Sequence, residues 1–482
     1  MSSSFMEECL SDTLKTRFNL TSLYPYQELV INNIMQAKSG YRNQLVILPT
    51  GSGKSICFML PALLLPNLTL IVYPLLSLMN DQLRRIENIG GSAVVLKGGQ
   101  TTAERRTIWQ ALQSGTVKFI LTNPETLGNP SIIRQLRPFT FSLMVIDEAH
   151  AVVQWGKSFR PSYLELPPVI RSLEPERLIA FTATASKEII EGLAKDLFNG
   201  EKFHLIRGNP DRPNISYKVY PTLSKLHTAE MLITTGLPQP ALFFCATRKR
   251  TEQFAFLLQE RLPQVAIKYY HAGLAKKERD KIEKWFFAQE AALLFSTSAY
   301  GLGVDKPNIR SVVHIDLSGD IESYLQESGR GGRDGKACEA YVLLDGKERA
   351  SPLLEVMRGG SKCRREALLA LIGFESDSCA GCDVCNQKVI KRPEGLTQIL
   401  SFLRYYPLCY TQRQLIALLC GVPSESMILK GNPFFSILNT WQPRDLKEAL
   451  DKLKEAKIIK AFTRREVLIL SSNSPDGQLF PP

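Results

Sequence analysis

Two glycines, a lysine and a serine lie between an apolar strand pattern and an apolar helix pattern. Residues 50–55 read T-G-S-G-K-S and join the run LVIL to the run SICFMLPALLL. Glycines let backbone N–H groups turn toward phosphate oxygens, and the N-terminus of the helix adds partial positive charge. We expect Lys54 to reach the β- and γ-phosphates of a nucleotide and the Ser55 hydroxyl to hold Mg²⁺. Because Leu48 stands where the strict G-x-x-x-x-G-K-S pattern begins, a simple glycine-rich turn is the alternative.

A second apolar run, LMVI, ends in D-E-A-H, so Asp147, Glu148 and His150 follow a predicted strand. In nucleotide hydrolases, the carboxyl end of such a strand holds Mg²⁺ and the attacking water. We expect Asp147 to bind Mg²⁺ and Glu148 to polarise the water. A solvated acidic turn is the alternative, and the upstream glycine-rich loop makes it the poorer one. A third run, AFTATAS, has a hydroxyl-rich end that suits coupling this site to another.

The strand–helix alternation restarts after GNPDRPNI, without a second phosphate-binding loop. In this second series, YLQESGRGGRDG provides Arg330 and Arg333, three residues apart at a predicted helix start. Arginines placed in this way can point into the phosphate site of a neighbouring lobe and stabilise charge in the transition state. A solvated basic loop is the alternative interpretation.

Four cysteines have the spacing of a metal site. Cys363 is followed after fifteen residues by CAGCDVC, which contains Cys379, Cys382 and Cys385. Structural zinc takes four ligands in a tetrahedron, and thiolates are its preferred ligands. We therefore predict a zinc site. The other six cysteines are scattered among apolar neighbours and are predicted to be small core residues: Cys9, Cys57, Cys245, Cys338, Cys409 and Cys420.

The composition describes a large, basic chain that needs several domains to bury its apolar residues. It has 482 residues, 44% of them hydrophobic, which indicates three or four domains. No apolar run reaches the length of a membrane span, and the N-terminus does not read as a signal peptide. We expect a cytoplasmic protein, associated with the nucleoid if prokaryotic. The net charge of +12 favours a polyanionic partner but also has other causes.

The composition shifts after NQKVIKRPEG. Three segments have helical periodicity (LTQILSFLRYY, TQRQLIALLCG and PRDLKEALDKLKEAKII), and KAFTRREVLILSS alternates like a hairpin. Three helices followed by a ribbon indicate a winged helix. Lys460, Arg464 and Arg465 lie on or near the wing and could contact DNA phosphates. A purely structural ribbon is the more common case.

These motifs together resemble the RecQ family of DNA helicases, within helicase superfamily two, over nearly the whole chain. The matching stretches are PTGSGKS, YPLLSLMNDQ, TNPE, DEAHAVVQWGKSFRPSY, FTATA, FFCATRKR, YYHAGL, YGLGVDKPNI and QESGRGGRDG. The segment after DEAH resembles the loop with which the family senses single-stranded DNA: Gln154, Trp155, Lys157, Phe159 and Arg160. Aromatic faces stack on any base, and arginine adds a cation. The alternative is that Trp155 and Phe159 pack in a core.

The resemblance implies an α/β fold of two RecA-like parallel-sheet lobes, a zinc-binding helical subdomain and a winged helix that binds duplex DNA. The expected boundaries are 1–207, 208–345, 346–392 and 393–482. It also implies ATP, Mg²⁺ and Zn²⁺ as cofactors, with 3′-to-5′ unwinding of DNA in repair and recombination. Partners are single-stranded and duplex DNA, with no membrane, and we expect a monomer. The nucleotide contacts implied are Tyr24, Gln27, Thr50, Gly51, Ser52, Gly53, Lys54 and Ser55.

Several positions depart from the family pattern. The family has cysteine after DEAH and histidine after Q-W-G, where this chain has Ala151 and Lys157. The adenine motif has Leu20 at its aromatic position and Leu23–Tyr24 in place of Phe–Arg. Gln27 is kept and can read adenine through its amide, while Tyr24 is expected to take over stacking. Asp305 replaces an asparagine near the nucleotide or the contact between lobes.

Two other functions remain open from the sequence. An RNA helicase of the same superfamily is the nearer one, and the aromatic loop and four cysteines argue against it. A non-catalytic DNA-binding scaffold that keeps the motor fold is the other. The intact set Lys54, Asp147, Glu148, Arg330 and Arg333 argues against the scaffold.

Overall fold

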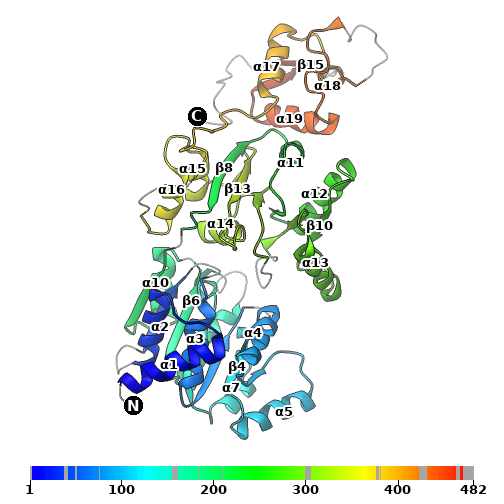
Figure 1. Cartoon of the computed structure of the whole chain (residues 1–482). Coiled ribbons are helices and arrows are strands. Elements are labelled where there is room, and N and C mark those ends of the chain that lie inside the picture. The colour runs from blue at the N-terminus through cyan, green and yellow to red at the C-terminus, as the bar shows by residue number, and fades with distance from the viewer. Residues whose placement is uncertain are drawn as a thin grey trace. The chain divides into compact units, whose positions relative to one another are not determined.

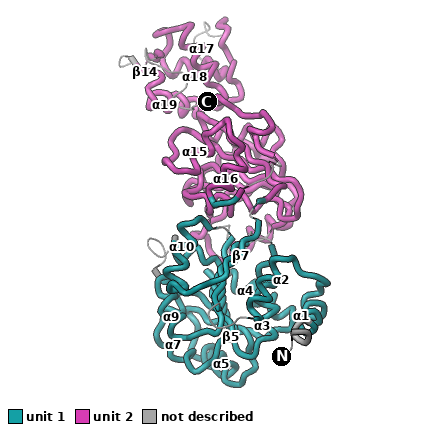
Figure 2. The backbone as a smooth tube through the Cα atoms, turned by 90° about the vertical axis from the view of Figure 1, so that its left-hand side faces the viewer, with its two compact units in different colours: residues 1–211, 372–374 teal, residues 212–371, 375–482 magenta. Residues whose placement is uncertain are grey.

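The computed structural model of the chain describes residues 3–36, 42–48, 52–74, 76–154, 161–183, 185–209, 211–298, 306–375, 379, 381–422, 431–462 and 467–470. The chain forms two compact units, coloured separately in Figure 2. Unit 1 comprises residues 1–211 and 372–374, and unit 2 comprises residues 212–371 and 375–482. The four domains expected from the sequence remain a prediction. In the described part of the chain, no helix is both long and apolar enough to cross a membrane.

Unit 1 is built on a seven-stranded parallel sheet in the order β3-β4-β2-β5-β6-β1-β7. Its strands are β1 (Asn43–Ile47), β2 (Leu68–Val72), β3 (Ala93–Val95), β4 (Phe119–Thr122), β5 (Phe141–Ile146), β6 (Leu178–Thr182) and β7 (Phe203–Arg207). The central strands are short apolar runs with almost every residue buried. Such runs are typical of parallel strands that are covered on both faces.

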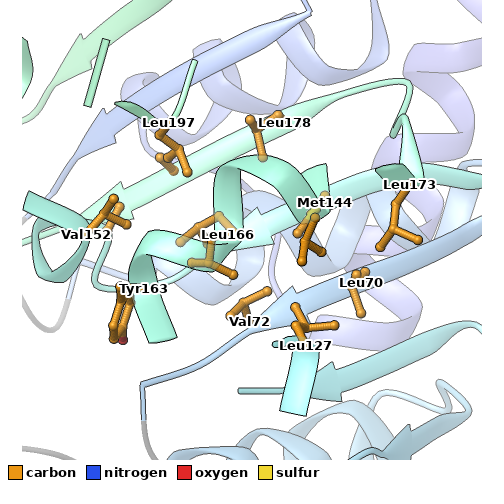
Figure 3. Close-up of a cluster of buried hydrophobic side chains, with 14 of the residues drawn as sticks. Leu70, Val72, Leu127, Met144, Val152, Tyr163, Leu166, Leu173, Leu178 and Leu197 are labelled. Carbon is orange, nitrogen blue, oxygen red and sulfur yellow. The ribbon is translucent and has the colours of Figure 1, made fainter. Parts of the chain in front are cut away.

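Helices follow most strands of unit 1 (Figure 1). They are α1 (Ser3–Phe18), α2 (Pro25–Met35), α3 (Lys54–Leu64), α4 (Leu76–Asn88), α5 (Thr102–Gln113), α6 (Pro124–Leu127), α7 (Pro130–Leu136), α8 (His150–Gln154), η1 (Pro161–Glu165), α9 (Leu166–Leu173) and α10 (Lys187–Asp196). Successive strand residues point to opposite faces, so β1 places Leu45 in one core cluster and Val46 in another. Figure 3 shows the first cluster, in which Leu70 and Met144 of the sheet pack near Leu166 of α9.

Unit 2 begins with a second parallel sheet, in the order β10-β11-β9-β12-β13-β8. Its strands are β8 (Ile215–Pro221), β9 (Ala241–Phe244), β10 (Ile267–Tyr270), β11 (Leu293–Ser296), β12 (Ser311–His314) and β13 (Cys338–Leu344). Its helices are α11 (Lys225–Thr234), α12 (Arg248–Arg261), α13 (Lys276–Ala288) and α14 (Ile321–Ser328). Two RecA-like lobes are therefore present, as the sequence predicted.

The rest of unit 2 holds the cysteines and a small C-terminal module. Two helices, α15 (Pro352–Arg358) and α16 (Arg364–Leu371), precede the cysteine-rich loop. The module, residues 395–470, contains α17 (Leu396–Tyr405), α18 (Gln412–Cys420), α19 (Pro443–Glu455) and the antiparallel pair β14 (Ile459–Phe462) and β15 (Val467–Leu470). This element order agrees with a winged helix, which remains a prediction. Lys460 lies on β14, and Arg464 and Arg465 lie outside the described residues.

Candidate nucleotide-binding and catalytic site

The glycine-rich loop leads into α3, as the sequence predicted. Gly53 is the N-cap of α3 and has φ of +75°, in the left-handed region that favours glycine. A Cβ atom at Gly53 would lie 2.6 Å from Nε2 of Gln27, so the loop also needs glycine for close packing. Lys54 and Ser55 form the first turn of α3. Thr50 and Gly51 lie outside the described residues.

Lys54 and Glu148 come together at the carboxyl end of β5. Nζ of Lys54 lies 3.7 Å from Oε1 of Glu148, and the two side chains are only 15% and 10% exposed. Glu148 has φ of +51°, and its N–H donates to Oδ1 of Asp147 at 3.0 Å. A non-glycine residue in this backbone region marks local strain, which surrounding contacts must hold. The structure therefore brings the predicted lysine and carboxylates into one site.

Burial raises the pKa of Asp147 to about 6. The Lys54 charge opposes this rise in pKa, and the neighbouring Glu148 charge adds to it. A divalent cation at Asp147 would stabilise the charged carboxylate and lower this pKa. The Ser55 hydroxyl, the other expected magnesium ligand, donates to Oε1 of Gln82 at 3.3 Å. These oxygen donors have the chemistry that Mg²⁺ prefers.

His150 connects the acidic motif to the end of β6. Its Nδ1 lies 2.9 Å from Oγ1 of Thr182 and 3.4 Å from Oε2 of Glu148. All three side chains are largely buried. Thr182 belongs to the AFTATAS stretch, so one hydroxyl of this stretch lies beside His150, which in turn lies beside Glu148.

A cavity of about 650 Å³ lies beside the loop, where the sequence predicts the base of a nucleotide. Its lining includes Leu20, Tyr24, Gln27, Ser52 and Met59. The ring of Tyr24 is well exposed and lies parallel to the ring of Tyr26, at 5.5 Å between centroids and 11° between planes. This orientation leaves Tyr24 available for the stacking expected of it.

The amide of Gln27 makes hydrogen bonds within the protein. Its Oε1 accepts from the N–H of Tyr24 at 3.0 Å, and its Nε2 donates to the carbonyl of Ser52 at 3.1 Å. An amide keeps one further donor hydrogen and one further lone pair, so adenine can still be read. Gln27 also holds the phosphate loop, a role that the sequence did not reveal.

Arg330 and Arg333 lie in unit 2, and the predicted helix start is wrong. Helix α14 ends at Ser328, so both arginines follow the helix in a turn. The glycines explain the difference: Gly332 has φ of +54°, and a Cβ at Gly331 would clash with Sγ of Cys338. The turn therefore requires glycine and packs closely against β13.

Arg212 and Asn214 hold this turn, and the sequence analysis missed both. The guanidinium of Arg212 donates to the carbonyls of Gly329, Gly331 and Gly332 at 2.9–3.2 Å. Nδ2 of Asn214 donates to the carbonyl of Gly332 at 2.8 Å. Both come from the stretch GNPDRPNI, whose polar residues beside β8 were the available signal.

The four predicted zinc ligands come together in unit 2. The Sγ atoms of Cys363, Cys379, Cys382 and Cys385 all lie within 4.8 Å of one another. Four sulfurs around one zinc ion, at about 2.3 Å each, would be about 3.8 Å apart, so the cluster fits zinc with a small contraction.

Of the other cysteines, four are buried, but Cys9 is half-buried and Cys409 is exposed. The core prediction for Cys409 is therefore wrong: it lies in the exposed link between α17 and α18.

The loop after α8, which the sequence predicts to sense single-stranded DNA, falls largely outside the described residues. Trp155, Lys157, Phe159 and Arg160 lie there, as does Asp305. The main chain of α8 ends at Gln154, directly before this loop. Ala151, one of the departures from the family pattern, is fully buried in α8.

Two helicase families match this chain. Residues 24–191 match the DEAD/DEAH box helicase family, and residues 224–335 match the helicase conserved C-terminal domain. In solved structures, the chain resembles the DEAD-box helicase Mss116 bound to ssRNA and UDP-BeF. The TM-score is 0.61 at 18% identity, covering 92% of this chain and 96% of that one. The lobes and motifs thus define a helicase of superfamily two.

Curated relatives identify the family within that class. The chain is 31% identical over 402 residues to the ATP-dependent DNA helicase RecQ of Pasteurella multocida, covering 79% of this chain and 62% of the relative. It is 30% identical over 440 residues to the ATP-dependent DNA helicase RecQ of Haemophilus influenzae, covering 86% of this chain and 70% of that protein. The chain belongs to the RecQ family. It spans less than two thirds of the length of the Pasteurella relative.

Proposed function

We propose that the protein is an ATP-dependent DNA helicase of the RecQ type that translocates 3′ to 5′ and acts in DNA repair and recombination. The main support from the structure is the meeting of Lys54, Glu148 and Asp147 at the glycine-rich loop. An ion pair this close, in a site this buried, suits a group that binds phosphate beside a group that orients water. The family membership supports DNA as the substrate.

In this proposal each residue has one role. Lys54 neutralises developing charge on the γ-phosphate. Ser55 and Asp147 hold Mg²⁺, which when bound offsets the charge of the phosphate oxygens. Glu148 orients the attacking water, and His150 holds Glu148 in place. Arg330 and Arg333 of the second lobe stabilise charge in the transition state.

Coupling to DNA is assigned to the loop after α8. A base that stacks on Trp155 or Phe159 would shift a loop only a few residues from Asp147 and Glu148. Arg160 and Lys157 would add phosphate attraction. The four cysteines would hold a structural Zn²⁺, and the C-terminal module would contact duplex DNA as a winged helix. We expect a monomer in the cytoplasm, or at the nucleoid in a prokaryote.

The deciding experiment measures ATP hydrolysis and strand separation with the same protein. We expect single-stranded DNA to stimulate hydrolysis far more than single-stranded RNA. Duplexes with a 3′ tail should be unwound, and duplexes with a 5′ tail should not. Lys54→Ala is the inactive control. Stimulation by RNA equal to that by DNA would favour the RNA helicase, and DNA binding without hydrolysis would favour the scaffold.

A further inference from the structure

One carbonyl of the phosphate loop receives two hydrogen bonds from helix α2. The Tyr26 hydroxyl donates to the carbonyl oxygen of Ser52 at 2.9 Å. Nε2 of Gln27 donates to the same oxygen at 3.1 Å. The carbonyl group has two lone pairs and can accept both. Neighbouring residues of α2 thus fix the direction of a single peptide group in the loop.

The direction of this carbonyl also fixes the N–H group that follows it. A trans peptide is planar, so the C=O of Ser52 and the N–H of Gly53 point in opposite directions. Because the carbonyl points toward Tyr26 and Gln27, the N–H of Gly53 points away from α2. The left-handed φ of Gly53 then begins α3 at Lys54. In loops of this type, such N–H groups face the phosphate oxygens.

The two donors are held with different strength. Gln27 is 5% exposed, and its Oε1 is tied to the N–H of Tyr24, so its amide is fixed at both ends. Tyr26 is half-buried, and its ring lies against the exposed ring of Tyr24. Burial raises the pKa of the Tyr26 hydroxyl, so at neutral pH it keeps the proton that it donates. Tyr26 is therefore the less constrained of the two donors.

We propose that Tyr26 is a positioning residue that orients the Ser52–Gly53 peptide for the triphosphate, through the bond from its hydroxyl to the Ser52 carbonyl. The ligand recognised through Tyr26 is the polyphosphate chain, independent of the base. This inference rests on the proposed nucleotide binding.

The test is Tyr26→Phe, which keeps the stacked ring and removes the hydroxyl alone. We expect KM for ATP to rise about twofold to tenfold, the worth of one neutral hydrogen bond, with kcat within twofold of wild type. Inorganic tripolyphosphate, which has no base, should inhibit hydrolysis. Its inhibition constant should rise by the same factor as KM. A purely structural role would lower the melting temperature without this parallel change.

The matched control is Thr107→Val on the exposed helix α5. It also removes one hydroxyl-to-carbonyl bond, from Thr107 to Ala103, and should change none of these constants. An unchanged KM in Tyr26→Phe would overturn the inference, as would a raised KM with an unchanged tripolyphosphate constant. If that variant folds poorly, the rise in melting temperature that tripolyphosphate causes is compared between Tyr26→Leu and wild type, and an equal rise overturns the inference. A wild type without ATP hydrolysis would instead contradict the proposed function.

Discussion

At the scale of single residues, the charge of Glu148 is the feature on which the proposed chemistry depends. Glu148→Gln keeps the shape of the side chain and removes the charge that is proposed to orient the attacking water. We expect kcat to fall about 10²- to 10⁴-fold, while nucleotide affinity changes little because Lys54 remains. Steady-state hydrolysis with saturating DNA measures the first quantity, and equilibrium nucleotide binding measures the second.

The control for this substitution is Glu191→Gln on the surface of α10, where the side chain is 67% exposed. It should hydrolyse ATP at the wild-type rate. If Glu148→Gln also kept the wild-type rate with DNA present, another residue would have to orient the water.

A second prediction at this scale concerns Trp155. Trp155→Ala should keep the unstimulated ATPase and lose most of its stimulation by DNA, together with unwinding. Stacking on one base is worth about 1–3 kcal/mol, enough to bias a loop between two positions. The measurement is the ATPase rate against single-stranded DNA concentration. Equal maximal stimulation in wild type and variant would mean that Trp155 packs in a core and does not sense DNA.

At the scale of elements, Asp383 fixes the cysteine loop both to α16 and to strand β8 of the second lobe. Asp383, between two of the cysteines, pairs with Arg364 of α16 and accepts from the N–H of Val219 in β8. Bound zinc would contribute to folding directly, since its ligands must come together around it. We therefore predict about one zinc per chain in the purified protein.

Cys385→Ser should lose this zinc and lower the melting temperature of unit 2. Cys409→Ser, at an exposed cysteine outside the cluster, should keep the zinc and the wild-type melting temperature. Metal analysis and thermal unfolding of the two variants test the prediction. A wild-type protein without zinc, in which all ten thiols react freely, would contradict it.

At the scale of the whole molecule, buried charges join the C-terminal module to the second lobe. Asp345, at the end of β13, pairs with Lys452 of α19 at 2.9 Å and with Lys225 of α11 at 3.6 Å. Arg261 of α12 pairs with Asp445 of α19 at 2.7 Å. Without Asp345, and among the described residues, Lys452 would keep only its pair with Glu448, and Lys225 only its pairs with Asp316 and Glu348. The module is thus attached to the lobe through specific ion pairs.

Asp345→Asn should therefore destabilise the attachment of the module, while Glu455→Gln should have little effect, because Glu455 is 61% exposed. Burial alone would raise the pKa of Asp345, but Lys225 and Lys452 lower it below its usual value. The stabilisation is therefore complete above the unfolded pKa of about 3.9 and is lost as pH falls through the lower folded value. Thermal unfolding at pH 7 compares the variants with wild type, and thermal unfolding of wild type at pH values below 3 follows the loss of this stabilisation. Equal melting temperatures of wild type and Asp345→Asn at pH 7 would contradict this account.

The sequence by itself determined the features that depend on local spacing. Apolar runs and glycine placement predicted the strand, the glycine-rich loop and the helix around residues 45–65, and the position of Asp147 after an apolar strand, while the resemblance to the RecQ family implied the two parallel-sheet lobes. The spacing of Cys363, Cys379, Cys382 and Cys385 predicted their cluster. These features depend on short-range geometry, which a linear pattern records directly.

The tertiary structure decided which distant residues meet. Three such contacts join residues that are separated in the chain by between 26 and 120 positions. They are the bond from Tyr26 to Ser52, the bonds from Arg212 to the turn that holds Arg330 and Arg333, and the ion pair of Asp345 with Lys452. No periodicity encodes such pairs, because side-chain hydrogen bonds and ion pairs form wherever folding removes their groups from water. Folding alone also decided that Arg330 follows a helix, since the close approach of β13 requires a glycine turn there.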